Sequence, residues 1–76
     1  MSVPYYIRMK KVRLAHGRKQ KDVADLLGIS RRTYSDYERG ILRIPVEYLI
    51  VLARYYDVSM DYLTGITNIR REYPVM

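Results

Sequence analysis

The chain of 76 residues contains no cysteine, no tryptophan and no phenylalanine, and only four glycines and three prolines. Without cysteine, neither a disulfide nor a thiolate-bound zinc can stabilise the fold. No run of about 18 uninterrupted apolar residues is present, so the sequence predicts no membrane-spanning helix. The first six residues lack the apolar run of a signal peptide and are soon followed by Arg8, Lys10 and Lys11. We therefore expect a soluble, intracellular protein whose single domain is held together by packing alone.

Groups of catalytic or metal-binding residues are also missing. The only histidine, His16, stands near the end of an expected helix with no other ligand close to it in sequence. The acids Asp22, Asp25, Asp57 and Asp61 fit helix starts and solvated surfaces better than a catalytic pair. We find no Ser/His/Asp combination, phosphate-binding loop or metal-ligand spacing. The sequence predicts neither an enzyme nor a metal site nor a bound cofactor.

Positive charge is concentrated in the first part of the chain. Residues 1–43 carry eleven Lys and Arg against four acids, which gives a net charge of +7. Residues 44–69 carry one basic residue against three acidic ones, a net charge of −2. A basic half joined to a mildly acidic half indicates that a polyanion binds to one side of the molecule.

Glycine and proline divide the chain into five segments of helical length. Apolar residues recur every three or four positions within the segments, and no alternating pattern is long enough for a strand. The sequence predicts an all-α fold with no sheet in residues 1–65 and with helices near residues 5–16, 20–27, 31–38, 46–56 and 60–64. We assign residues 1–65 to one domain and residues 66–76 to a C-terminal tail.

The fourth segment has the clearest amphipathic pattern. We expect its core-facing stripe to consist of Val46, Leu49, Ile50, Ala53 and Tyr56. A second apolar stripe of the same segment consists of Tyr48, Val51 and Tyr55. Either a second copy of the chain or the tail residues Ile66 and Ile69 would cover this stripe, and the former makes it a candidate dimer contact.

Residues 20–39 have the pattern of two helices that cross over a short turn. Ala24 provides a small residue at the crossing, and Gly28 provides the positive φ that the turn requires. Ser30 is suited to cap the second helix. Apolar or aromatic residues are placed to face inward from both helices: Val23, Leu27, Ile29, Tyr34 and Tyr37. The outward positions after the turn are polar and suit a groove of DNA: Arg31, Arg32, Thr33 and Asp36.

From Met9 to Gly65 the chain resembles the Cro/CI-type helix-turn-helix family, also called the lambda-repressor-like or XRE family. The resemblance rests on the segments QKDVA (20–24), LGIS (27–30), YERG (37–40) and LIVLARYYDVSMDYL (49–63). It implies a compact five-helix domain of a bacterial or phage transcription regulator, often a repressor that binds palindromic operators as a dimer. The chain departs from the family pattern at Arg18, where leucine is usual, and at Tyr34, where Ile or Val is usual.

The resemblance and the residue types together give each polar residue an expected role. Arg31, Arg32, Thr33 and Asp36 would read bases, because the arginine fork matches O6 and N7 of guanine. The resemblance further implies a structural ion pair between Arg13 and Glu38. The phosphate contacts would lie at the start of the second helix and in the loop after the third: Lys19, Gln20, Lys21, Arg39 and Arg43.

Two questions stay open at the start of the third helix. Arg31 and Arg32 point in different directions, so we expect one to read bases and the other to contact phosphate in part. Asp36 either accepts from cytosine N4 or pairs with Arg32 four residues earlier and orients it, and we favour the second role.

The expected partner is double-stranded DNA, bound by a homodimer in the cytoplasm of a bacterium, at the nucleoid. The alternative is an antitoxin or protein-interaction module of the same fold, with a toxin as its partner. RNA binding is a weaker interpretation, because the aromatic residues are used inside the domain and not on its surface.

Overall fold

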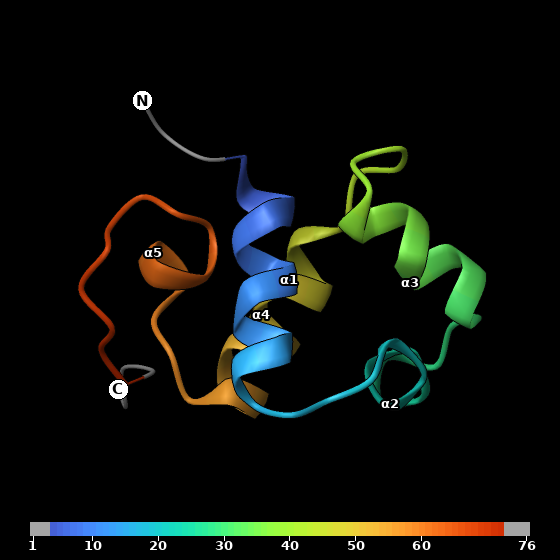
Figure 1. Ribbon diagram of the computed structural model, residues 1–76, viewed down its shortest axis with the longest axis horizontal. Coiled ribbons are helices and arrows are strands. Elements are labelled where there is room, and N and C mark those ends of the chain that lie inside the picture. The colour runs from blue at the N-terminus through green and yellow to red at the C-terminus, as the bar shows by residue number, and fades with distance from the viewer. Residues whose placement is uncertain (1–3, 73–76) are drawn as a thin grey trace.

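The computed structural model describes residues 4–72 and contains five helices and no strand within that range (Figure 1). The helices are α1 (Tyr5–Ala15), α2 (Gln20–Leu27), α3 (Arg31–Glu38), α4 (Val46–Tyr56) and α5 (Met60–Leu63). The predicted all-α fold is confirmed, although α1 and α5 each end one residue earlier than expected. Residues 1–3 and 73–76 lie outside the described range, so the end of the predicted tail 66–76 is not described.

Helix α1 lies in the middle of the molecule, with α2 and α3 on one side of it and α5 on the other (Figure 1). It packs against α3 on one side and against α5 on the other, while α2 packs on α3 and α4 packs on α5. The α2–α3 pair and the segment that follows α5 therefore lie on opposite sides of α1 (Figure 1). This arrangement leaves the outer surface of α3 open.

Buried side chains from all five helices and from the segment after α4 form one core. The fully buried residues include Met9, Val23, Ala24, Tyr34, Leu52, Ala53, Val58 and Leu63. Leu27 and Ile29 pack against this cluster from the turn between α2 and α3. The expected inward positions of α2 and α3 are thus all in contact with the core.

The expected core face of α4 is partly wrong. Leu49, Leu52, Ala53 and Tyr56 are buried, but Val46 and Ile50 are 56% and 37% exposed. The four buried residues follow the spacing i, i+3, i+4, i+7, which places them on one face of a helix. Ile50 lies about 100° around the helix from Leu49 and therefore falls beside this face. Val46 lies in the first turn, next to the loop that precedes the helix.

The turn between α2 and α3 has the geometry that its sequence predicts. Gly28 adopts φ 70°, and the N–H of Ile29 donates to the carbonyl of Ala24 at 3.0 Å. The hydroxyl of Ser30 then accepts from the N–H of Thr33 at 3.0 Å and caps α3. Since a side chain at φ 70° is strained, glycine at position 28 lets α3 follow α2 after so short a turn.

Gly40 follows the end of α3 and lies against α1. Its φ is 75°, and a Cβ atom placed on it would lie 2.7 Å from the ring of Tyr6. The Tyr6 ring of α1 therefore packs directly on the backbone that follows α3. This contact and the polar network described below fix α3 to α1.

The segment after α5 is held by Arg8 of α1. Its guanidinium donates to the carbonyls of Tyr62 and Thr67 at 3.0 and 3.1 Å and lies 4.7 Å from the centre of the Tyr62 ring. Ile66 and Ile69 in this segment are 76% and 59% exposed. Both side chains are therefore mostly open to solvent, which gives no support to the alternative that they cover Tyr48, Val51 and Tyr55, from here on called the α4 stripe.

Candidate nucleic-acid interface

The outer surface of α3 presents two arginines at its first turn. Arg31 and Arg32 are exposed, whereas Tyr34 on the inner side of the same helix is fully buried. Thr33 is half-buried, and its hydroxyl accepts a hydrogen bond from the Ser30 hydroxyl at 2.9 Å. The side chain of Thr33 is therefore engaged in the cap, while both guanidinium groups extend into solvent.

Asp36 lies between two arginines on the same surface. Its Oδ2 is 3.9 Å from Nε of Arg32, and its Oδ1 is 3.7 Å from Nη1 of Arg39. The carboxylate is only 16% exposed, whereas the Arg32 side chain is 86% exposed. This placement suits the role of orienting Arg32 that we favoured from the sequence.

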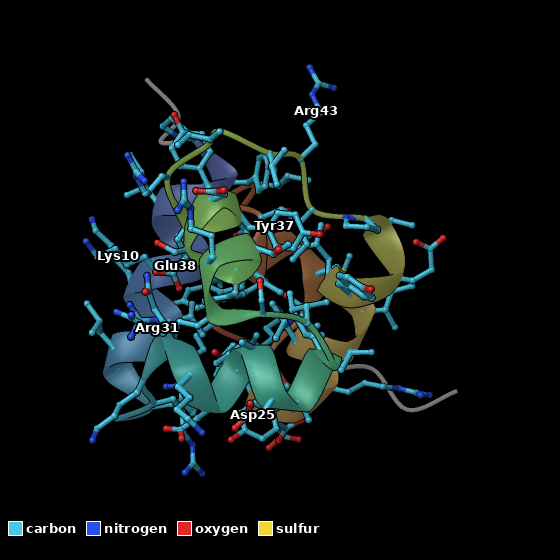
Figure 2. The ribbon with its side chains drawn as sticks, turned by 90° about the vertical axis from the view of Figure 1, so that its right-hand side faces the viewer. Lys10, Asp25, Arg31, Tyr37, Glu38 and Arg43 are labelled. Carbon is cyan, nitrogen blue, oxygen red and sulfur yellow. The ribbon has the colours of Figure 1, made fainter. Side chains whose placement is uncertain are left out.

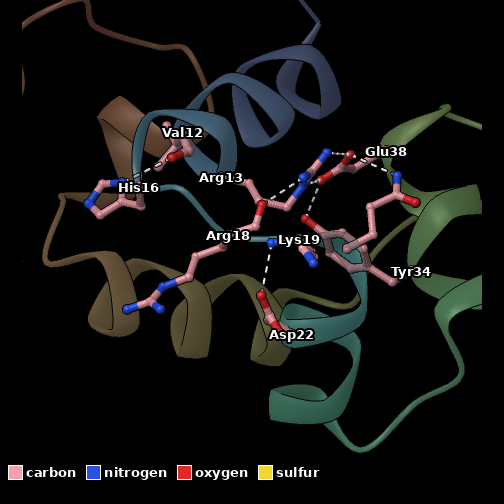
Figure 3. A network of polar contacts seen from close by, with 9 residues as sticks. Val12, Arg13, His16, Arg18, Lys19, Asp22, Tyr34 and Glu38 are labelled. Carbon is pink, nitrogen blue, oxygen red and sulfur yellow. Dashed lines mark hydrogen bonds and ion pairs between the residues drawn. The ribbon is translucent and has the colours of Figure 1, made fainter.

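A buried ion pair connects α1 with the end of α3 (Figure 3). Arg13 donates from Nε to Oε2 of Glu38 at 2.7 Å and from Nη2 to Oε1 at 3.0 Å. Both residues are buried. Such a two-pronged contact fixes the direction of both side chains as well as their separation. The pair therefore sets the angle of α3 against α1.

Two more donors complete the hydrogen bonds of the Glu38 carboxylate. The Tyr34 hydroxyl donates to Oε2 at 2.5 Å, and the Gln20 amide donates to Oε1 at 3.1 Å. Arg13 also donates from Nη1 to the carbonyl of Arg18 at 2.8 Å, in the loop between α1 and α2. The network thus joins α1, that loop, the first residue of α2 and α3 (Figure 3).

The network determines the protonation of its members. Burial alone would raise the pKa of Glu38, but hydrogen bonds from Arg13, Tyr34 and Gln20 outweigh it and hold the pKa below its usual value. The hydrogen bond to Glu38 raises the pKa of Arg13 despite burial. Burial and the carboxylate together raise the pKa of Tyr34. Glu38 is therefore a carboxylate, and Tyr34 remains protonated and donates to it.

A basic hollow opens beside the start of α3. It has a volume of about 530 Å³ and lies between α1, the loop that follows it, the start of α2 and the start of α3. No acidic residue lines it, and the exposed Arg31 borders it together with the first residues of α2. Its lining consists of Arg13, Leu14, Arg18, Lys19, Gln20, Lys21 and Arg31.

The cations of the expected phosphate-contacting set lie on both flanks of α3. Arg43, in the loop before α4, extends into solvent on the other side of α3 from Arg31 (Figure 2). Lys19, Lys21 and Arg39 are exposed as well. Lys21 forms a surface ion pair with Asp25 at 3.1 Å.

These features agree with the comparison with known proteins. The helix-turn-helix family model matches residues 9–63 of the chain. The chain belongs to the Cro/CI-type helix-turn-helix family. The uncharacterized HTH-type transcriptional regulator YobD of Bacillus subtilis (strain 168) is 38% identical over 64 residues, 84% of this chain and 57% of the relative. No solved structure matches the chain significantly.

Two further relatives come from the same organism. The HTH-type transcriptional regulator AnsR is 43% identical over 58 residues, 70% of this chain and 50% of its own length. The HTH-type transcriptional regulator ImmR is 38% identical over 58 residues, 76% of this chain and 46% of its own length. The chain thus spans about half the length of the curated relatives that it matches.

Within this helix-turn-helix domain, the structure adds contacts that the sequence analysis did not assign. The sequence predicts only a phosphate contact for Gln20, yet its amide also donates to Glu38. Tyr34 was expected only as a core residue, yet its hydroxyl joins the same carboxylate. The spacing of four residues between Tyr34 and Glu38 was the available signal for the second contact.

The α4 stripe is not uniformly exposed. Tyr48 is half-buried and its ring lies edge-on to Tyr37, with the ring centres 6.4 Å apart. Val51 and Tyr55 are exposed, and the guanidinium of Arg18 lies 5.5 Å from the centre of the Tyr55 ring. The side chains of the α4 stripe that are open to a partner are therefore mainly Val51 and Tyr55.

No group of three or more metal-ligating side chains occurs within residues 4–72. His16 contacts the carbonyl of Val12 through Nδ1 at 2.9 Å, and its ring packs on that of Tyr56. None of the helices in the described part of the chain has the length and apolarity needed to cross a membrane.

Proposed function

We propose that this chain is a sequence-specific double-stranded DNA-binding protein and a transcriptional repressor that places α3 in the major groove. The observation that carries the proposal is the exposed pair Arg31 and Arg32 at the start of α3. Their helix is anchored to α1 by the buried pair of Arg13 and Glu38. A fixed helix that presents two guanidinium groups suits the recognition of guanine edges.

In this proposal the polar residues of α3 read bases, and flanking residues, four cations and Gln20, contact phosphates. The base-reading set is Arg31, Arg32 and Thr33, with Asp36 as the residue that orients Arg32. The phosphate-contacting set is Lys19, Gln20, Lys21, Arg39 and Arg43. Positive residues on both sides of α3 suit a helix in the major groove, because a phosphate backbone borders the groove on each side.

The regulator would act as a homodimer on a palindromic operator. Recognition helices of such a dimer lie one DNA turn apart, about 34 Å. The protomer measures 30 × 29 × 22 Å, so two copies side by side have a suitable separation. The contact would be formed by the α4 stripe, chiefly Val51 and Tyr55, together with the tail 66–76.

The cell compartment would be the cytoplasm of a bacterium or of a phage-infected bacterium, at the nucleoid. The relatives described above are from Bacillus subtilis, and a further one, YonR, is described as SPbeta prophage-derived. All three relatives described above are named as transcriptional regulators, which favours regulation over the antitoxin alternative.

The test is a set of alanine variants on DNA. The operator is first selected from a random DNA pool with the wild-type chain. Affinity for that operator and for a scrambled sequence is then measured at several salt concentrations. Loss of a base-reading arginine, Arg31 or Arg32, is expected to cost about 1–3 kcal/mol on the operator and little on scrambled DNA.

The matched variants are Lys19→Ala, Gln20→Ala and Arg43→Ala. Loss of a cation that contacts phosphate is expected to weaken binding to every DNA sequence alike. It should also reduce the slope of log affinity against log salt by about one. Because Gln20 is uncharged, Gln20→Ala is expected to weaken binding to both DNA sequences with little change in the slope of log affinity against log salt. If Arg31→Ala and Arg32→Ala both leave the ratio of the two affinities unchanged, the assignment of α3 is wrong.

A further inference from the structure

One face of α1 runs along α3 and the basic hollow. Tyr6, Lys10 and Leu14 are spaced by four residues and therefore share this face. Tyr6 packs on Gly40 at the end of α3, and Leu14 lines the hollow together with Arg31. Lys10 lies between these two contacts, so its place on the α3 side of α1 is fixed from both ends.

Lys10 is exposed and is directed to the same side of the molecule as Arg31 (Figure 2). Within residues 4–72 neither side chain takes part in an ion pair, and Lys10 forms no hydrogen bond through its ammonium group. Their charges are therefore not neutralised by the protein. Lys19 lines the hollow together with Arg31, and Lys10 lies one turn before Leu14, which lines it as well, so the three cations lie near one another on this side of the molecule.

We propose that Lys10 extends the DNA-binding surface beyond the helix-turn-helix and contacts a backbone phosphate from α1. The proposal rests on the function proposed above. Because Leu14 of α1 lines the same hollow as the first residues of α2, a strand bound at the start of α2 would also pass this side of α1. The ammonium group of Lys10 acts there as a point charge on a flexible stem, which suits a phosphate better than a base edge.

Lys11 provides a matched control. It is an exposed lysine of the same helix and forms no ion pair within the described residues. It lies about 100° further around α1 than Lys10 and nearly opposite Arg13, the α1 residue that pairs with Glu38 of α3, so it is directed away from α3. If only the total charge of the chain attracts DNA, the two lysines are equivalent. If Lys10 touches phosphate, they are not.

The experiment compares Lys10→Ala, Lys10→Arg and Lys11→Ala with the wild-type chain on operator and scrambled DNA over a range of salt. We expect Lys10→Ala to lower the affinity for both DNAs by roughly two- to fivefold at low salt. The slope of log affinity against log salt should fall by about one. Lys10→Arg should restore both values, and Lys11→Ala should change neither.

Equal effects of Lys10→Ala and Lys11→Ala would overturn the proposal, as would a loss confined to the operator. Equal unfolding temperatures of the two alanine variants would show that a difference in affinity comes from the DNA contact and not from a loss of stability. The proposed function fails separately, if the wild-type chain prefers no sequence in the selection. In that case Lys10→Ala still distinguishes a local phosphate contact from general charge on any duplex that the chain binds.

Discussion

The hydroxyl of Tyr34 donates to Oε2 of Glu38 over a distance of 2.5 Å, one turn later in the same helix. The tyrosine ring is fully buried, so this polar group reaches the network from within the core. It shares the carboxylate with Arg13 and Gln20, which belong to two other helices. Tyr34, bulkier than the Ile or Val usual at this position in the family, thus has a polar function in addition to packing.

The first prediction concerns this hydroxyl. Tyr34→Phe keeps the ring and removes one of the hydrogen bonds of a buried carboxylate, which typically contributes about 1.5–3 kcal/mol. We expect a loss of stability of that size, measured by denaturant unfolding. Tyr37→Phe is the control, because the Tyr37 hydroxyl has no hydrogen-bond partner within residues 4–72. Equal losses in the two variants would show that the contact to Glu38 has no special weight.

The second prediction concerns pH. The pKa of Glu38 is lowered in the folded state, so the unfolded chain takes up this proton first as the pH falls. The stabilisation by Glu38 is therefore complete above the unfolded-state pKa of about 4.3 and is lost below it. We expect Glu38→Gln to be less stable than wild type at pH 7, with the difference shrinking as the pH falls below about 4.3. A difference that does not change with pH would contradict the assigned pKa direction.

The third prediction concerns the two glycines that flank α3. Gly28→Ala adds only the strain of a positive φ, about 1–2 kcal/mol, since no atom lies near the added methyl group. Gly40→Ala adds the same strain and a clash with the Tyr6 ring, so we expect a larger loss. In a Tyr6→Ala background the two losses should become equal. A persistent difference there would show that the ring is not its cause.

The fourth prediction concerns Asp36. If this carboxylate orients Arg32, Asp36→Ala should lower the ratio of operator to scrambled affinity roughly two- to fivefold, the range of an exposed ion pair. The effect should vanish in an Arg32→Ala background, which a double-mutant cycle measures. If Asp36 instead accepts from cytosine, the effect will remain in that background and will be confined to one base pair of the operator.

The sequence by itself determined the five helices, because the signals that define them are local. The positive φ at Gly28, the cap at Ser30 and the apolar spacing of α2 and α3 need no distant contact to be recognised. The polar outer surface of α3 follows directly from that spacing. The family pattern over residues 9–63 is local in the same sense.

Only the tertiary structure decided which of two adjacent faces of α4 is buried and how the charges are partnered. Val46 and Ile50 are as apolar as Leu49 and Leu52, so hydropathy does not distinguish the faces. The choice depends on which side α5 and the rest of the core cover. Likewise the sequence contains the carboxylate of Glu38 and its donors, but three helices must meet before their hydrogen bonds form. The position of α3 against α1 is a property of that meeting, because packing and buried polar contacts depend on distance in space and not on spacing along the chain.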